Sequence, residues 1–300
     1  GYIRFSRGTL LDVLNQDYIR TARAKGLTER TVIMRHAFRN TMIPLTTIMV
    51  GDIASIVGGA IITERVFAWQ GMGTLFNKAI NTFDLKDSVL RITKAYDAIL
   101  ASGALPMTMG GDHTLTLPIL RAIAKKHGPV ALVHVDAHAD INDHMFGEAI
   151  AHGTPFRRAY EESLINPKKV WQIGLRGTGY TSEDFNEARG WGFNVVQAEE
   201  IWQQPLGPLA ERVKAQIGDT PVYITYDIDS LDPAYAPGTG TPEICGLTTP
   251  QAVQLIRGLR GLNIVGCDLV EVSPPYDTSG NTALTAANLL YEMLCILPGV

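Results

Sequence analysis

The chain has 300 residues, of which 46% are hydrophobic and 19% are charged, and this excludes a disordered or collagen-like protein. Such a length fits one or two folded domains with a sizeable core. The formal net charge of −4 is unevenly distributed, since residues 1–80 hold 10 Lys and Arg against 5 Asp and Glu, whereas residues 81–300 hold 16 against 25. The asymmetry predicts two segments with different partners or different origins, and the acidic second segment argues against nucleic acid as a partner.

Cysteines and histidines are distributed in opposite ways. Cys245, Cys267 and Cys295 lie far apart without a C-x-x-C pair, which predicts a reducing compartment and no thiolate zinc site. Six of the seven histidines fall within residues 113–152. That concentration indicates a functional site in this part of the chain.

Residues 1–40 form a basic, helix-prone stretch. Gly26 interrupts the helical pattern, so two helices on either side of a short turn are predicted. The order of features that defines a signal peptide is not found in this stretch.

Residues 41–63 form an apolar run of 23 residues whose only ionisable side chain is Asp52. In helical conformation such a run would cross about 30 Å of hydrocarbon. Gly51, Gly58, Gly59 and several threonines dilute its hydrophobicity, so a transmembrane helix and a buried soluble segment are both open interpretations.

The runs NQDYIRTARAKGLTERTVIMRHAFRNTMIP and ERVFAWQGMGTLFNKAI resemble part of an oligopeptide/dipeptide-type ABC transporter permease. The ARAKGL stretch is similar to that family's cytoplasmic coupling loop, which docks on an ATPase subunit. The resemblance covers about residues 1–80 and implies only a fragment, because the other membrane spans of the family are absent. If residues 41–63 insert, they imply an inner-membrane anchor with the basic residues 1–40 on the cytoplasmic side.

From residue 81 onward, helical and strand patterns alternate. Helical spacing is found at 84–103, 208–217, 249–260 and 283–297, and short apolar runs between these stretches read as buried strands. This alternation predicts an α/β fold with a mostly parallel sheet, in which ligands gather at the carboxyl ends of the strands.

Four of the predicted strands end in carboxylates or imidazoles. These ends are Gly110-Gly111-Asp112-His113, Asp136-Ala137-His138-Ala139-Asp140, Asp227-Ile228-Asp229 and Asp268-Leu269-Val270-Glu271. Any one of them could simply cap the following helix. Together, the four ends would place several carboxylates at one sheet edge, where they repel one another unless cations neutralise them.

The charge and the donor types of these ends predict a dinuclear metal site. Asp136, Asp140, Asp227 and Asp229 together carry −4, which two divalent ions would balance. Oxygen donors with His113 and His138, and no thiolate, favour an ion such as Mn²⁺. The chemistry predicted from the residues is metal-assisted hydrolysis of a polar, planar electrophile.

The motifs GGDH, DAHAD, AHGTPF, TYDIDSLDPAYAPGTGTPE and GCDLVEVSPPYDTSGNTALTAANLLYEML resemble those of the ureohydrolase family, in its agmatinase/guanidino-acid hydrolase branch. The resemblance covers about residues 81–300. It implies a three-layer α/β/α fold, two Mn²⁺ ions with Ni²⁺ or Co²⁺ as alternatives, a homo-oligomer and a cytoplasmic location. It also implies cleavage of a small guanidino substrate to urea and an amine, with agmatine and guanidino acids such as 4-guanidinobutyrate both open.

The resemblance also implies roles for individual residues. One ion would be held by His113, Asp136, Asp140 and Asp227, and the other by Asp136, His138, Asp227 and Asp229. A bridging hydroxide would attack the guanidinium carbon, and Asp140 would take its proton. His152 would shuttle protons and face the substrate, and Glu271 would bind the guanidinium.

Other positions receive structural expectations. His134, inside a predicted strand, is expected to pack behind the ligands, and the loop around Tyr180 is expected to shape the entrance.

The permease-like segment stands where the family has its first strands, so the strand at 104–109 is expected to have an exposed apolar edge. The alternative function is a non-functional or membrane-associated gene fusion with a permease remnant.

Overall fold

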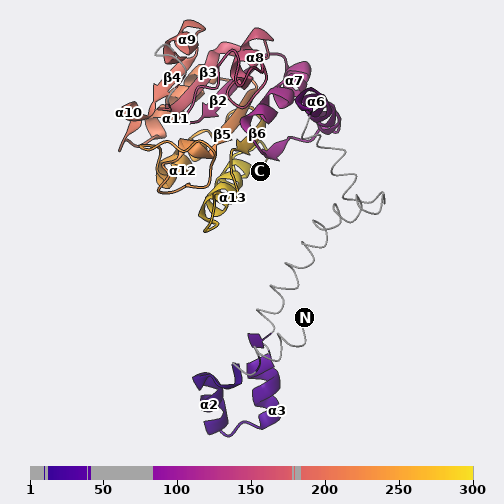
Figure 1. The fold of residues 1–300 in the computed structure, drawn as a ribbon, viewed down its shortest axis with the longest axis vertical. Coiled ribbons are helices and arrows are strands. Elements are labelled where there is room, and N and C mark those ends of the chain that lie inside the picture. Colours follow the sequence, from indigo (N-terminus) through magenta and orange to yellow (C-terminus); the bar gives the residue numbers. More distant parts are fainter. Residues whose placement is uncertain are drawn as a thin grey trace. The chain divides into compact units, whose positions relative to one another are not determined.

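The computed structural model describes residues 10, 13–38, 40–41, 84–177, 179 and 184–299. The chain divides into two units, Gly1–Asn81 and Thr82–Val300, and each is described by itself (Figure 1). The sheet and the clustered histidines belong to the second unit.

The described part of the first unit is a small helical cluster. Helix α2 (Asp17–Ala24) is followed by a turn at Gly26, whose φ of 77° favours glycine, and then by α3 (Glu29–Thr31), which continues as the π-helix η1 (Val32–Ala37). Ile19, Val32 and Ala37 are fully buried in a cluster of their own. The two helical segments predicted on either side of Gly26 are therefore confirmed.

The membrane interpretation concerns residues 41–63, of which all but Thr41 lie outside the described residues. Among the residues that the structure describes, no helix combines the length and the apolar character that crossing a bilayer requires. The transmembrane helix stays a prediction from the sequence.

The second unit is built on a parallel sheet, as predicted. Its six described strands follow the spatial order β1-β6-β5-β2-β3-β4, and every pairing among them is parallel. The strands are β1 (Met107–Met109), β2 (Val130–Val135), β3 (Ile165–Leu175), β4 (Asn194–Gln197), β5 (Val222–Asp227) and β6 (Ile264–Val270).

Helices cover both faces of this sheet, which gives the predicted three layers (Figure 1). One face is covered by α6 (Leu85–Ala101), α7 (Thr116–His127), α8 (Pro155–Glu161) and α9 (Asp184–Gly190). The other face is covered by α10 (Ala198–Ile201), α11 (Gly207–Ile217), α12 (Thr249–Gly258) and α13 (Asn281–Leu294). Two single-turn 3-10 helices, η2 (His113–Leu115) and η3 (Ile228–Ser230), follow β1 and β5.

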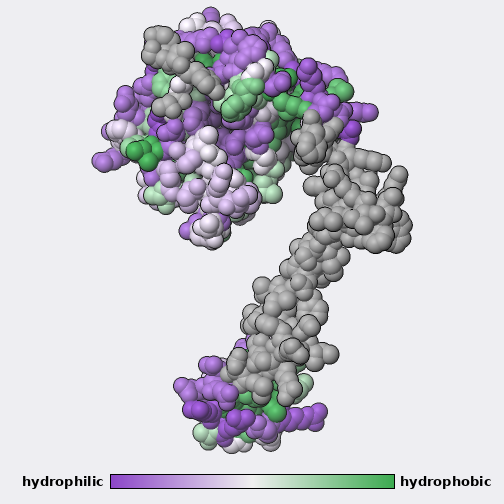
Figure 2. All heavy atoms as spheres, viewed as in Figure 1, coloured by the Kyte–Doolittle hydropathy of each residue, from purple (hydrophilic) through white to green (hydrophobic). Residues whose placement is uncertain are grey.

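Side-chain alternation along the strands explains the two cores. In β2, Val133 and Val135 pack on the face of α11 and α12, whereas Val130 and Leu132 pack on the face of α7. All six residues of β2 are buried, as expected for a central parallel strand covered on both sides. In the view of Figure 2, the surface of the second unit is mostly hydrophilic, with scattered apolar side chains.

The expected exposed edge is present in the described sheet. Strand β1 pairs only with β6 among the described strands and forms one end of the strand order. Met107 is 39% exposed and Met109 is 80% exposed, so the side chains that this edge strand leaves uncovered on one face are apolar.

Candidate metal centre

The four predicted strand ends meet at one edge of the sheet. Strands β1, β6, β5 and β2 are consecutive neighbours, so the segments that follow them lie side by side at their carboxyl ends. Six candidate ligands come from three of these ends and converge there: His113, Asp136, His138, Asp140, Asp227 and Asp229.

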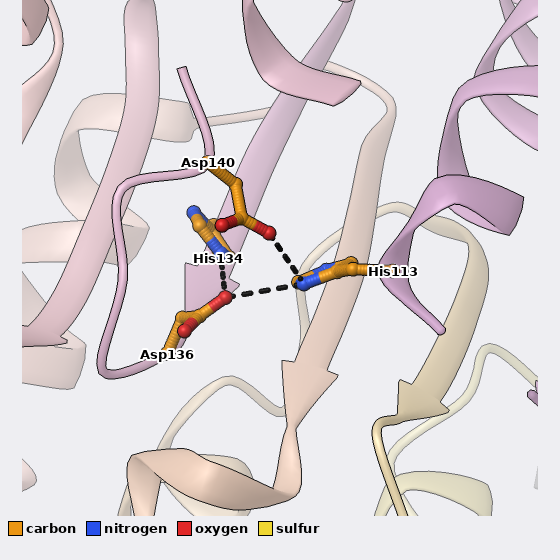
Figure 3. A group of neighbouring side chains, drawn as sticks. All are labelled: His113, His134, Asp136 and Asp140. Carbon is orange, nitrogen blue, oxygen red and sulfur yellow. Dashed lines mark hydrogen bonds and ion pairs between the residues drawn. The ribbon is translucent and has the colours of Figure 1, made fainter. Parts of the chain in front are cut away.

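His113 is the centre of the first cluster (Figure 3). Its Nδ1 lies 3.1 Å from Oδ2 of Asp136, 3.1 Å from Oδ2 of Asp140 and 3.3 Å from Oδ2 of Asp227. Its Nε2 lies 2.8 Å from the hydroxyl of Thr225 on β5. The imidazole is buried, so these groups are its polar surroundings.

His138 and Asp229 form the second cluster. Nδ1 of His138 lies 3.1 Å from Oδ2 of Asp229 and 3.5 Å from Oδ1 of Asp136. Asp229 also accepts hydrogen bonds from the backbone N–H of Ala137 at 3.1 Å and from the hydroxyl of Thr241 at 3.1 Å. Asp136 therefore takes part in both clusters, one oxygen facing each histidine.

His134 supports Asp136 from behind, as expected from the sequence. The amide Nε2 of Gln172 donates both to the carbonyl of Ala139 at 2.7 Å and to Nδ1 of His134 at 3.1 Å. Nδ1 is therefore the acceptor, and Nε2 of His134 carries the proton that it donates to Oδ2 of Asp136 at 2.7 Å. Although His134 lies within the cluster drawn in Figure 3, this tautomer makes it a donor to a ligand.

A row of polar side chains, all buried except the half-buried Thr108, runs across the sheet beneath the clusters. Strand register aligns Thr108 with Asp268, Asp268 with Thr225, Thr225 with His134, and His134 with Gln172. The row thus crosses β1, β6, β5, β2 and β3 at one level, directly before the strand ends that carry the carboxylates.

Two of the predicted catalytic residues adopt left-handed backbone conformations. Asp140 has a φ of 50° and Glu271 a φ of 64°, a region that residues other than glycine rarely occupy. Glu271 is held there by two contacts, because its Oε1 accepts from the backbone N–H of His113 at 2.8 Å and its own N–H donates to the carbonyl of Gly111 at 2.9 Å. Such local strain is typical of functional sites.

A cavity of about 420 Å³ opens onto the clusters. Asp140, Asp227, Asp229, Glu271 and His152 all contribute to its wall, so the residues predicted to bind substrate face the predicted metal ligands across one space. Its size suits a small molecule.

The carboxylates oppose one another electrostatically. Burial raises the pKa of Asp227 well above its usual value, and the charges of Asp229 and Asp136 raise it further. Burial and the charge of Asp136 also raise the pKa of Asp229. Burial raises the pKa of Glu271 to about 7. By contrast, although burial acts in the opposite direction, the neighbouring histidines hold the pKa of Asp136 well below its usual value. The protein thus offsets the charge of Asp136 but not that of Asp227 or Asp229.

The donor set fits a pair of divalent cations. Nδ1 of His113 is buried and has no hydrogen-bond partner among the described residues, although three carboxylates surround it. In the neutral tautomer whose Nε2 donates to Thr225, Nδ1 points a lone pair at negative oxygens, and a cation between them would remove that repulsion. The second cluster shares Asp136 with the first and supplies the donors for a second cation.

Several supporting residues carry no recognisable signal in the sequence. Thr225, Gln172 and Thr241 contact predicted ligands or their supports, and Arg176 reaches the same region. Thr225 stands two residues before Asp227, so the period of a strand could have placed both on one face. The part of the Tyr180 loop at 180–183 lies outside the described residues.

Comparisons with known proteins identify the family of the chain. The profile of the Arginase family matches residues 23–295. Guanidinobutyrase of Pseudomonas aeruginosa is 67% identical over 222 residues, which cover 74% of this chain and 70% of the relative. Mitochondrial guanidino acid hydrolase of Homo sapiens is 59% identical, with 74% of this chain and 63% of the relative covered. The chain thus spans about two thirds of the length of these relatives.

Solved structures show the same fold. Proclavaminate amidino hydrolase from Streptomyces clavuligerus superposes with a TM-score of 0.67 and 41% identity, covering 70% of this chain and 71% of that one. Arginase from Bacillus caldovelox superposes with a TM-score of 0.63 and 26% identity, covering 69% and 74%. From its sequence match, its parallel sheet and its relatives, the chain belongs to the arginase family of ureohydrolases.

Proposed function

We propose that the chain hydrolyses a small linear guanidino compound to urea and an amine at a dinuclear Mn²⁺ centre. The observation that carries the proposal is the buried Nδ1 of His113, which faces three carboxylates without a hydrogen-bond partner in the described residues. The names of the relatives, guanidinobutyrase, agmatinase and guanidino acid hydrolase, support a guanidino substrate.

The proposed ligands follow the two clusters. His113, Asp136, Asp140 and Asp227 would hold one ion, and Asp136, His138, Asp227 and Asp229 the other. When bound, the two ions would supply a water of lowered pKa and positive charge for the reaction. Oxygen and imidazole donors without a thiolate favour Mn²⁺, with Ni²⁺ or Co²⁺ as alternatives.

The side chains around the cavity would handle substrate and protons. Asp140 borders both the His113 cluster and the cavity, and it would accept the proton of the attacking water. Glu271 would bind the planar guanidinium through paired hydrogen bonds, because its carboxylate lines the same cavity. His152, also on the wall, would pass a proton to the leaving amine.

The test is urea release by the full chain loaded with Mn²⁺, with agmatine and 4-guanidinobutyrate assayed separately. We expect urea and the matching amine in equal amounts from at least one substrate, and none after removal of metal by a chelator. Two bound ions without urea from either compound would overturn the proposed activity.

A cytoplasmic homo-oligomer is proposed from the family resemblance and is tested by fractionation and light scattering.

The permease interpretation of residues 1–80 stays a prediction from the sequence. The Arginase profile begins at residue 23, inside this segment, and the relatives reported above are hydrolases. The fusion with a transporter remnant therefore receives no support from them.

A further inference from the structure

The side chain of Arg176, the residue that follows β3, is surrounded by main-chain carbonyls. Its guanidinium donates to six main-chain carbonyls at 2.7–3.2 Å, those of Gly174, Asp229, Ser230, Leu231, Glu243 and Ile244. None of these acceptors is a side chain, so the charge of Arg176 is used to fix backbone.

The six carbonyls belong to three separate segments of chain. Gly174 lies in β3, Asp229 to Leu231 lie in and after η3 at the end of β5, and Glu243 and Ile244 lie in a loop of the cavity wall. The backbone of Arg176 reaches a fourth segment, because its N–H donates to the carbonyl of Ala137 at 2.8 Å. Ala137 stands between Asp136 and His138.

These segments carry the second cluster. Asp229 holds His138 through the 3.1 Å contact of Oδ2 with Nδ1. The wall loop adds Thr241, which donates to the same oxygen of Asp229, and Glu243, whose Oε1 lies 3.8 Å from Nε2 of His138. Asp229, His138 and the wall loop therefore converge on one half of the site, and Arg176 contacts the backbone of Asp229 and of the loop.

A guanidinium is the side chain that suits this arrangement. Its five N–H groups lie in a fixed plane and can serve carbonyls arriving from several directions, whereas a lysine ammonium offers three donors around one point. The positive charge also lies near Asp229, Asp136, Asp232 and Glu243 and offsets part of their charge. The guanidinium packs closely against Gly246, where a Cβ would lie 2.4 Å from Nη2 of Arg176.

We propose that Arg176 is a positioning residue for the second ion of the centre, acting by fixing Asp229 and the 241–244 wall loop against His138. The inference rests on the proposed dinuclear function. It assigns no contact between Arg176 and the ion or the substrate.

The test compares Arg176→Lys with the wild-type full chain by metal analysis after equilibration with Mn²⁺, by calorimetric titration and by kinetics. We expect bound Mn²⁺ to fall from two ions towards one per chain, with affinity for the second ion weakened about 10- to 100-fold. The activity that remains should recover at high Mn²⁺. The melting temperature of the metal-free variant should also fall, because lysine leaves some of the six carbonyls without a donor, so the affinities of the two ions in the folded chain are the deciding measurement. The control Arg121→Lys, which alters the paired contacts to Glu162 at 2.6 and 2.7 Å, should bind both ions with wild-type affinity.

Other outcomes would overturn either the positioning role or the proposed function. Two ions bound by Arg176→Lys with wild-type affinity would overturn the positioning role, and a wild-type chain that binds no ion would overturn the proposed function instead. Equal weakening of both ions would also overturn the assignment to the second ion. If Arg176→Lys does not fold, Thr241→Val is the second variant, because it removes the hydrogen bond between the wall loop and Asp229 and leaves Arg176 unchanged. Wild-type binding of the second ion by Thr241→Val would overturn the proposal.

Discussion

The two halves of the candidate centre differ in what supports them. The inner half, His113 and Asp140, is buried, and the imidazole of His113 contacts Thr225 in a central strand. In the outer half Asp229 is equally buried, but the side chain of His138 is 22% exposed, and both residues contact the wall loop at 241–244. A ligand supported by strands keeps its position without the ion, whereas a ligand supported by loops depends on their packing. The outer ion should therefore be the more easily lost.

Asp136 belongs to both halves, so its substitution should abolish binding of the inner and the outer ion alike. In Asp136→Asn we expect loss of both ions and no detectable urea formation, because the shared oxygens lose their charge. Metal analysis and the urea assay measure this. Asp143→Asn, at an exposed carboxylate paired with Arg158 at 2.6 Å, is the control and should bind two ions. Retention of both ions by Asp136→Asn would show that Asp136 is not shared.

Substituting the two histidines one at a time should distinguish the inner half of the centre from the outer half. His113→Asn and His138→Asn should each weaken one ion by more than about 10²-fold, since even changes behind the ligands cost about 10- to 100-fold. Only His113→Asn should also lower the free energy of unfolding of the metal-free chain, by about 1–3 kcal/mol, because it removes the buried contact between the imidazole and the hydroxyl of Thr225. Titration calorimetry and thermal melts separate the two effects. Equal melting temperatures of the metal-free variants would contradict the proposed difference.

Removing the ions should destabilise the second unit as a whole. At an ion concentration about 100-fold above Kd, binding contributes about 2.7 kcal/mol, so a chelator should lower Tm by roughly 5–10 °C. Adding Mn²⁺ back in steps should restore Tm in two stages if the halves fill separately. A Tm that does not respond to chelation would mean that the carboxylates hold no ion in the purified chain.

Glu271 lies against the inner half but is proposed to bind substrate, not metal. Glu271→Gln keeps an oxygen for the N–H of His113 and loses the charge, so KM should rise about 10- to 100-fold, equivalent to about 1.5–3 kcal/mol. Bound metal should remain at two ions per chain. A loss of metal with unchanged KM would reassign Glu271 to the metal-binding set.

The smallest expected effect comes from a single methyl group beside the outer half. A Cβ on Gly177 would lie 2.3 Å from Cδ2 of His138, so Gly177→Ala should turn the imidazole and weaken the second ion about 10-fold. Gly111→Ala is the matched control beside the inner half, because a Cβ there meets nothing within 4 Å. Calorimetric titration of both variants is the measurement, and equal affinities would show that His138 does not need its present orientation.

The sequence alone determined the elements and the candidate ligands. Helix and strand periods are local, so α11 at 207–217 and α12 at 249–258 lie within two residues of the predicted ranges. The spacing of two between Asp227 and Asp229, and across Asp136, His138 and Asp140, placed carboxylates at strand ends before any pairing was known.

Only the tertiary structure decided how these ends are supported. The polar row from Thr108 to Gln172 depends on the register of five strands, and register is a property of pairing that no single segment encodes. The surroundings of Arg176 consist of main-chain carbonyls, which every residue carries and which therefore leave no trace in composition. The types of the ligands follow from the sequence, but the rigidity of each half follows from contacts between distant segments.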